Sequence, residues 1–228
     1  MISGVTSIPL FLNERKGYKN FQQRSYVDNK RAYFILKRVV DIFVSVLFIL
    51  FILSWFSVII ALIITADSRG LVFFIQRRVG KTGRSFPCFK FRTMIVNRES
   101  DNKRAVPNDP RITRVGKFLR NYNLDEFPQF LNVLLGHMSI VGPRPHMHSD
   151  CYAFAQTIPG YKFRTFVKPG ITGLAQAKGF HGPVANQEVV KKRFEYDAFY
   201  VRNASVELDL RIITATVARR TQLFFCLL

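Results

Sequence analysis

The sequence from Ile42 to Ala66 reads IFVSVLFILFILSWFSVIIALIITA and holds no charged residue in 25 positions. A helix of this length extends ~37 Å, which exceeds the ~30 Å hydrocarbon core of a bilayer. A core helix of a soluble domain seldom presents apolar residues on every face for seven turns. The stretch therefore predicts a helix inserted in a membrane.

Basic residues flank this stretch on both sides. Within about 20 residues, six precede it and five follow it: Lys19, Arg24, Lys30, Arg31, Lys37 and Arg38, then Arg69, Arg77, Arg78, Lys81 and Arg84. Because positively charged flanks tend to stay on the cytoplasmic side, two such flanks favour a re-entrant helix that enters and leaves at one face. A spanning helix that exports the short N-terminal arm is the alternative.

A re-entrant helix has to bend, and Ser54 and Trp55 stand at the middle of the run. Helix bends normally have an identifiable cause such as proline or glycine, and the run contains neither. Ser54 with its neighbouring packing is the candidate bend, and a straight spanning helix is again the alternative.

The remaining segments predict a helix-rich α+β fold attached to the membrane element. We expect a polar arm at 1–30, an interfacial and membrane-inserted helix at 31–66, and a cytoplasmic domain at 67–228. Within that domain we expect the following: a short hairpin from 72–76 and 86–91, a mobile loop at 97–110, two helical pieces within 115–135, a rigid turn at 142–145, an irregular glycine-rich stretch at 167–182, and helices at 188–201 and 208–223.

The composition restricts the partners and the compartment. The 228 residues carry a net charge of +19, which favours nucleic acid, anionic lipid headgroups or nucleotides as partners. The three cysteines, Cys88, Cys151 and Cys226, are far apart and form no CxxC pair. This pattern indicates neither a disulfide framework nor a zinc site, and it agrees with a reducing cytoplasmic setting.

Two adjacent carboxylates, Asp125 and Glu126, are the only acids between Asp109 and Asp150, and nine Lys or Arg residues lie between positions 90 and 120. We expect Asp125 at a helix N-terminus with Pro128 in the first turn. Free N–H groups and the helix dipole would keep Asp125 ionised and attract a phosphate.

Neighbouring helical residues point about 100° apart, so the two acids suit different roles. One can attack phosphorus while the other binds a divalent cation. An ordinary helix cap is the alternative reading of an isolated Asp-Glu pair. The basic surroundings and the neighbouring motifs favour chemistry on a phosphorylated substrate at a membrane surface.

Six motifs follow one another along the chain: QRRVG (76–80), KFRTM (90–94), RITRVG (111–116), LDEFPQ (124–129), MSIVGPRP (138–145) and KPGITG (168–173). From about Lys37 to the C-terminus the sequence resembles the bacterial sugar transferase family, the monotopic polyprenyl-phosphate phosphoglycosyl transferases of the exopolysaccharide-initiating type. Each motif alone is weak, but six in this order are specific.

The resemblance implies transfer of a sugar-1-phosphate from a UDP-sugar to polyprenyl (undecaprenyl) phosphate, with release of UMP, at the cytoplasmic face of the bacterial inner membrane. It implies that Asp125 is the nucleophile that forms a covalent aspartyl-phosphosugar, and that Glu126 is catalytic and helps to hold Mg²⁺. The implied substrate-binding residues are Lys90, Arg92, Arg111, Pro143, Arg144, Pro145 and Lys168, with Arg144 on the nucleotide. The C-terminal segments 192–197 and 208–210 look like those of hexose-specific members.

The resemblance also implies a bilayer with anionic headgroups as a partner, and a homo-oligomer is possible. The chain departs from the family at Trp55, where relatives usually carry proline, and at His137, where they usually carry aspartate. These departures leave an inactive scaffold of a glycan-assembly complex as one alternative. A membrane-tethered polyanion-binding protein is another, but nucleic acid would not explain the paired acids or the Pro-Arg-Pro turn. We expect His137, His146 and His148 to be surface residues, because no fourth metal ligand has a suitable spacing.

Overall fold

The computed structural model describes residues 29–96, 106, 109–180 and 186–225. Its helical segments are α3 (Arg31–Phe48), η2 (Ile49–Leu53), α4 (Ser54–Asp67), η3 (Lys81–Gly83), α5 (Arg114–Tyr122), η4 (Leu124–Glu126), α6 (Gln129–Leu134), α7 (His148–Thr157), η5 (Tyr161–Phe166), α8 (Leu174–Ala177), α9 (Gln187–Asn203) and α10 (Val206–Phe225). Its strands are β1 (Phe73–Val79), β2 (Ser85–Phe91), β3 (Ser139–Val141) and β4 (Gly170–Thr172). The helix-rich α+β class is confirmed. The polar arm, apart from Asn29 and Lys30, and most of the loop at 97–110 lie outside the described residues.

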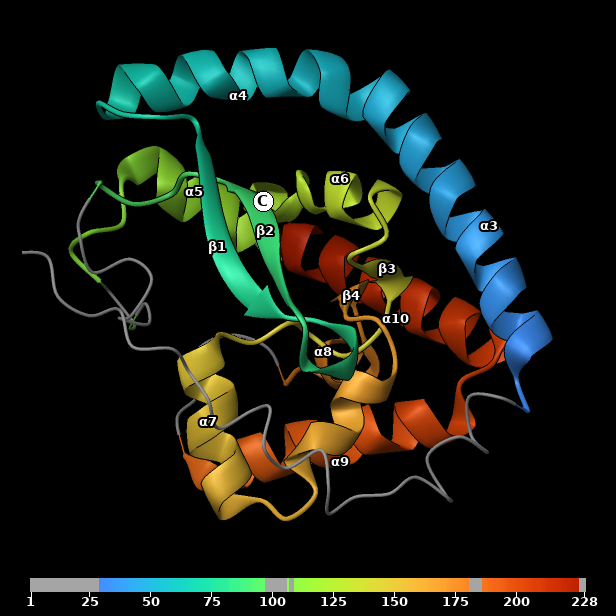
Figure 1. Ribbon diagram of the computed structural model, residues 1–228. Coiled ribbons are helices and arrows are strands. Elements are labelled where there is room, and N and C mark those ends of the chain that lie inside the picture. The colour runs from blue at the N-terminus through green and yellow to red at the C-terminus, as the bar shows by residue number, and fades with distance from the viewer. Residues whose placement is uncertain (1–28, 97–105, 107–108, 181–185, 226–228) are drawn as a thin grey trace, which may run out of the picture.

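The apolar run forms one bent helix made of α3, η2 and α4, which arches over the rest of the chain (Figure 1). Together these segments span 37 residues and are long and apolar enough to cross a membrane. Their outer face exposes large apolar side chains, among them Phe43, Phe51 and Leu62. The predicted long apolar helix is therefore present as a single element.

The bend coincides with η2, a π-helical turn just before Ser54. The Ser54 hydroxyl donates to the Leu50 carbonyl at 2.7 Å, and the Trp55 indole N–H donates to the Phe51 carbonyl at 2.7 Å. A π-turn loosens the regular i→i−4 ladder and bends a helix without proline. The side chains of Ser54 and Trp55 satisfy carbonyls at this point, so Ser54 acts at the bend as expected.

Polar residues on the inner side of α3 attach the helix to the domain. Asp41 is 4% exposed, and its Oδ1 accepts a hydrogen bond from the Ile140 N–H at 3.0 Å. The Lys37 ammonium lies 2.5 Å from Asp209 on α10. Arg38 donates to the last carbonyls of α6, those of Val133 and Leu134, at 2.6 and 2.9 Å. The segment expected to be interfacial is therefore also packed against the domain.

The hairpin predicted before the carboxylates is present as β1 and β2, paired antiparallel with Phe73 opposite Phe91 and Val79 opposite Ser85. The turn contains Gly80 and Gly83, as expected. On β2, Phe86 and Cys88 pack against Val133 and Met138, which ties the hairpin to α6. This packing places the end of β2 beside η4.

The stretch 167–182, expected to be irregular, contains β4 and α8, and β4 pairs parallel with β3. Short strands of three residues leave no periodic signal in the sequence, which explains the miss. The helices predicted at 188–201 and 208–223 are confirmed as α9 and α10. The helix α7 and the turn η5 were not predicted.

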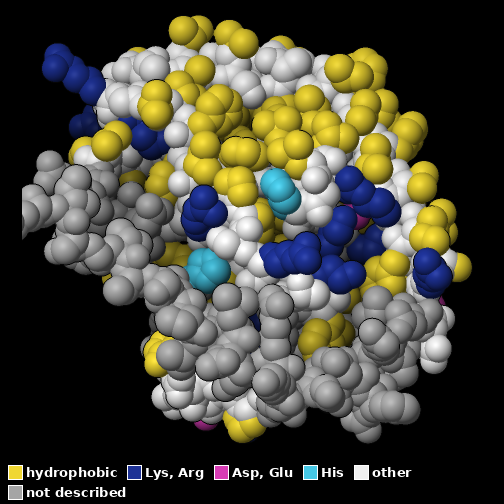
Figure 2. Space-filling model, viewed as in Figure 1, with side chains coloured by type: hydrophobic (Ala, Val, Ile, Leu, Met, Phe, Trp, Pro, Cys, Tyr) yellow, Lys and Arg dark blue, Asp and Glu magenta, His cyan; other side chains and the backbone are white. Residues whose placement is uncertain are grey.

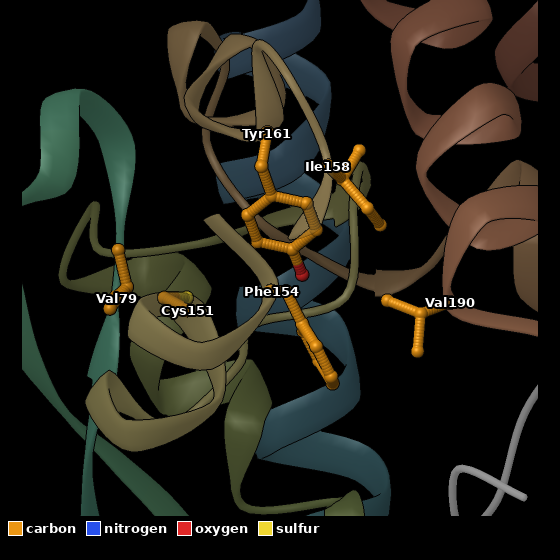
Figure 3. Packing of buried hydrophobic residues seen from close by; sticks show 6 residues of the cluster. All are labelled: Val79, Cys151, Phe154, Ile158, Tyr161 and Val190. Carbon is orange, nitrogen blue, oxygen red and sulfur yellow. The ribbon is translucent and has the colours of Figure 1, made fainter. Parts of the chain in front are cut away.

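Two apolar clusters lie at opposite ends of the β1–β2 hairpin. Under the bent helix, Leu53, Ile60 and Ile64 pack against Phe91 and Leu119. At the far end of β1, a second cluster joins β1, α7, η5 and α9 through Val79, Cys151, Phe154, Ile158, Tyr161 and Val190 (Figure 3). Leu124 of η4 packs against the first cluster, and the loop after β3 reaches the second, where the Val79 N–H donates to the His146 carbonyl at 3.0 Å.

We expect Asp41→Ala to destabilise the protein by about 1–3 kcal/mol, because the partly buried Ile140 N–H loses its acceptor. Thermal unfolding in detergent measures the effect. Asp41→Asn retains an acceptor oxygen and should lose less stability. Phe43→Ala, which is on the exposed face of the same helix, is the control that should change the unfolding temperature little. Unchanged unfolding of Asp41→Ala would contradict this role.

Candidate active site

The two carboxylates lie on η4, a single 3₁₀ turn between α5 and α6. Asn123 ends α5 in the left-handed conformation, with φ of 55°, which asparagine tolerates better than most residues. Pro128 is the N-cap of α6, and Asp125 precedes it by three residues. The prediction that Asp125 stands at the helix N-terminus is therefore wrong, because the chain makes a separate turn before α6 begins.

Glu126 is held by two cations from different elements. Its Oε1 lies 2.6 Å from the Lys90 ammonium on β2. The Arg144 guanidinium forks onto the same carboxylate, with Nη2 to Oε1 at 2.6 Å and Nη1 to Oε2 at 3.1 Å. Lys90 also lies 3.8 Å from Oδ2 of Asp125. One ammonium thus connects both carboxylates, although neighbouring side chains diverge along a helix.

Burial acts differently on the two acids. Both are buried, at 7% and 6% exposure. Burial raises the pKa of Asp125, and the negative charge of Glu126 raises it further, against the opposing charge of Lys90. For Glu126, burial also favours the neutral form, but Arg144 and Lys90 outweigh it and hold its pKa well below the usual range. The expectation that a helix terminus keeps Asp125 readily ionised is therefore wrong: desolvation dominates.

Two further cations act on this pair and were not predicted as site residues. Arg120 on α5 donates to the Thr93 hydroxyl at 2.7 Å, and its charge opposes the rise in the Asp125 pKa. Arg78 on β1 is half-buried, and it interacts electrostatically with Glu126 and Arg144. The alternation of β1, which puts Gln76 and Arg78 on one face, was the available signal for Arg78. Arg120 appeared only as the last member of the basic run.

The Pro-Arg-Pro turn is where the sequence predicts it, and it presents Arg144 between Pro143 and Pro145. The backbone crosses closely just before it: a Cβ added to Gly142 would lie 2.4 Å from the Lys168 carbonyl oxygen. Proline fixes φ on both sides of Arg144. The arginine that contacts Glu126 therefore projects from a stiff segment.

Of three further residues predicted to bind the substrate, two have protein partners and the third lies near another cation. Arg92 donates to the carbonyls of Ser68 and Arg69 after α4. Arg111 pairs with Asp109 through two hydrogen bonds of 2.9 and 2.6 Å. Lys168 lies with Arg38 beside Gly136, at whose position an added Cβ would be 3.7 Å from the Lys168 ammonium. No structural contact joins these three side chains to Asp125 or Glu126 among the described residues.

The described residues contain no group of three or more His, Cys, Asp or Glu side chains that would hold a metal ion. Asp125 and Glu126 offer two carboxylates, and Mg²⁺ in nucleotide-using enzymes often takes one or two carboxylates, waters and substrate phosphates. Oε2 of Glu126 accepts a single hydrogen bond among these residues, so it can accept a further ligand. The site thus fits an ion that arrives with a diphosphate, not an all-protein cage.

Of the three histidines expected at the surface, one is buried. His146 is 8% exposed, and its Nδ1 lies 2.5 Å from the Tyr161 hydroxyl. Burial, together with Arg164, Arg78 and Arg144, keeps its pKa well below the usual value, so this ring is neutral. The prediction of a surface position is wrong for His146, because the unpredicted α7 and η5 cover it.

Lys and Arg side chains gather on the face shown in Figure 2, below apolar side chains that cover its upper part, over α4. This arrangement places positive charge next to the apolar helix. It agrees with a protein that works at an anionic surface.

Comparison with known proteins relates this site to a family. The model of the bacterial sugar transferase family matches residues 32–222. The chain is 44% identical over 218 residues, 95% of its length, to a UDP-glucose:undecaprenyl-phosphate glucose-1-phosphate transferase of Klebsiella pneumoniae. It is 45% identical over 188 residues to the exopolysaccharide production protein PSS of Rhizobium leguminosarum, matching 80% of this chain and 94% of that protein.

A UDP-N-acetylgalactosamine-undecaprenyl-phosphate N-acetylgalactosaminephosphotransferase of Aeromonas hydrophila is 41% identical over 187 residues, 81% of this chain. The match spans only 43% of the length of this relative and 43% of the Klebsiella one. The family model nevertheless covers most of the chain, including both carboxylates and the Pro-Arg-Pro turn. The protein therefore belongs to the bacterial sugar transferase family.

Proposed function

We propose that this chain transfers a sugar-1-phosphate from a UDP-sugar to a polyprenyl phosphate and releases UMP, as a first membrane step of exopolysaccharide or related glycan synthesis. The observation that carries the proposal is the buried pair of unequal carboxylates, Asp125 and Glu126, joined by Lys90 and Arg144. Family membership and the names of the relatives support the reaction class. The apolar helix supports the cytoplasmic face of the inner membrane as the location, with a polyprenyl acceptor and anionic headgroups as partners.

In the first step we assign the nucleophile to Asp125. Its ionised carboxylate attacks the phosphorus that bears the sugar, the bond from that phosphorus to the oxygen bridging the two phosphates breaks, and UMP leaves. In the second step a phosphate oxygen of the polyprenyl acceptor attacks the same phosphorus and releases Asp125. A raised pKa suits this role, because a more basic carboxylate is a better nucleophile once it is deprotonated.

Two negatively charged partners repel each other in this reaction, so cations have to offset the repulsion. The Lys90 ammonium lies near both carboxylates. It can therefore shift its contact from Glu126 to the transferred phosphate. Arg144 is one-third exposed, whereas the Glu126 side chain is 8% exposed, so the guanidinium is the more accessible partner and is assigned to the nucleotide. Glu126 would help to hold Mg²⁺, which would supply positive charge to neutralise the leaving phosphate.

Lys168, Arg92 and Arg111 remain candidates for contact with the substrates. Lys168 stands beside Arg38 at the start of the membrane helix, which favours the acceptor phosphate over the donor. Arg92 and Arg111 already bind protein groups, so a direct role in phosphate binding requires them to change partners. A hexose-1-phosphate is proposed as the transferred group from the resemblance at 192–197, while relatives named for glucose and for N-acetylgalactosamine show that a panel of donors is needed.

We also propose that the bent helix is re-entrant. The π-turn at Ile49–Leu53 supplies the bend without proline, and basic residues flank both ends. Attachment of α3 and α4 to the same domain agrees with both ends lying on one side of the bilayer.

Asp125→Asn should lower UMP release by roughly 10³-fold or more, because the amide is a poor nucleophile. The assay contains detergent, Mg²⁺, polyprenyl phosphate and a panel of UDP-sugars. Glu207→Gln, an exposed change on α10, is the control and should behave as the wild type. Full activity of Asp125→Asn would exclude this nucleophile, and full activity in EDTA would exclude Mg²⁺.

A folded wild type that releases no UMP from any donor would favour the scaffold alternative. Strong polyanion binding that Asp125→Ala leaves unchanged would favour a polyanion-binding protein.

Activity should fall as the pH drops through the pKa of Asp125, which lies above that of an ordinary aspartate. Lys90 lowers this pKa and Glu126 raises it, so the acidic limb should move to higher pH in Lys90→Gln and to lower pH in Glu126→Gln. Shifts of the order of one pH unit are expected. Profiles of kcat/KM, each normalised to its own maximum, give the comparison even at low residual activity. Shifts in the same direction would contradict the assigned electrostatics.

Cysteine labels at Asn20 and Ser85 should react from the same side of sealed vesicles if the helix is re-entrant. The background protein carries serine in place of Cys88, Cys151 and Cys226. A membrane-impermeant maleimide added outside and then after permeabilisation distinguishes the sides. Labelling from opposite sides would mean a spanning helix.

A further inference from the structure

The segment Pro143–His146 is fixed through its carbonyl oxygens. Two of its four residues are prolines, which have no N–H to donate. All four carbonyls accept hydrogen bonds, and the first and last do so from backbone donors. Gly170 on β4 donates to the Pro143 oxygen at 3.0 Å, and Val79 on β1 donates to the His146 oxygen at 3.0 Å. The segment is therefore anchored at both ends by strands.

The two central carbonyls accept from guanidinium groups instead. Arg78 donates through Nη1 to the Pro145 oxygen at 2.9 Å. Arg164 on η5 donates through Nη2 to the Arg144 oxygen at 2.6 Å. The second bond is to Arg144, whose side chain forms two hydrogen bonds with Glu126. Arg164 therefore acts on the backbone of Arg144, not on its side chain.

Arg164 has a partner that makes its burial possible. It is 5% exposed, and its Nε and Nη2 lie 2.9 and 2.7 Å from Oδ2 of Asp197 on α9, itself 3% exposed. A buried guanidinium without a counter-charge is strongly unfavourable. The ring of Tyr161 lies 5.4 Å from the guanidinium carbon. Tyr161 packs in the cluster that joins η5 to α9 through Val190 (Figure 3), so both partners belong to one packed unit.

We propose that Arg164 and Asp197 are positioning residues for Arg144: Asp197 holds Arg164, and Arg164 fixes the peptide group that sets the direction of the Arg144 side chain. The inference rests on the proposed function, in which Arg144 binds the nucleotide. It also gives Asp197, within the segment that resembles hexose-specific members, a role in the scaffold behind the nucleotide site.

The geometry explains why this anchor matters. Proline fixes φ at 143 and 145, but it leaves φ of Arg144 and the ψ torsions of the turn to be set by other contacts. The Arg164 hydrogen bond fixes one of them, because rotation about ψ of Arg144 would carry the Arg144 oxygen away from the guanidinium. An arginine fork recognises its partner only in a narrow range of directions, and displacements of about 1 Å at a reacting site are costly in rate.

The test is Arg164→Lys with separate measurement of KM for each substrate. Lysine keeps the charge and can pair with Asp197, but it cannot reach Asp197 and the Arg144 oxygen with one rigid fork. We expect KM for the UDP-sugar to rise roughly tenfold, while KM for polyprenyl phosphate changes little. Asp197→Asn should shift the same constant in the same direction. Arg211→Lys, which alters an exposed ion pair with Glu207 on α10, is the matched control and should leave both constants unchanged.

A merely structural role predicts a different result. Loss of folded enzyme lowers the apparent kcat and leaves both KM values as in the wild type, and that outcome in the two variants would overturn the proposal. A double-mutant cycle adds a second criterion: in an Arg144→Ala background, Arg164→Lys should have no further effect on KM for the UDP-sugar. Additive effects would also overturn it.

The proposal can fail separately from the proposed function. Binding of UMP measured by calorimetry needs no turnover, and we expect Arg164→Lys to weaken it roughly tenfold while Arg211→Lys does not. Weakened UMP binding by Arg164→Lys, combined with a wild type that has no transferase activity, would retain the positioning role and reject the reaction. Normal UMP affinity in Arg164→Lys and Asp197→Asn, with an active wild type, would reject the positioning role alone.

Discussion

The desolvation of Asp125 and Glu126 is the constraint on which the site depends. Two adjacent carboxylates can be buried only if cations or hydrogen-bond donors compensate for the lost water. Lys90 and Arg144 supply that compensation from β2 and from the loop after β3, so the site exists only when these elements and η4 are assembled. Its charges are thus a product of tertiary structure, although the residues come from three motifs far apart in the chain.

The compensation is unequal, and the inequality separates the roles of the two acids. Arg144 and Lys90 both touch Glu126, which stays ionised, whereas Asp125 has Lys90 at 3.8 Å and a like charge next to it. One carboxylate can therefore remain an anchor for cations while the other changes its bonding. The same burial that makes Asp125 harder to ionise makes it more nucleophilic once it is ionised.

Local patterns predicted much of the fold, and long-range contacts account for what was missed. The apolar run, the β1–β2 hairpin, α9 and α10 follow from periodicity and turn residues in the sequence. The position of Asp125 in a 3₁₀ turn depends on Asn123 adopting a left-handed conformation. Asparagine permits this conformation, but the sequence alone does not predict it. The burial of His146 depends on α7 and η5. Likewise, the partners of Arg92 and Arg111 depend on how the loops pack in the folded protein. The spacing of residues in the sequence does not predict that packing.

Both halves of the apolar helix contact elements that carry residues of the site. Ile60 and Ile64 of α4 pack against Phe91 and Leu119, which directly follow Lys90 on β2 and precede Arg120 on α5. At the other end, Asp41 of α3 pairs with the backbone of β3, three residues before the Pro-Arg-Pro turn begins. A displacement of either half of the helix would therefore move an element that carries Lys90, Arg120 or Arg144. The bend at η2 lets one helix reach both places, so the shape of the membrane element and the geometry of the carboxylate site constrain each other.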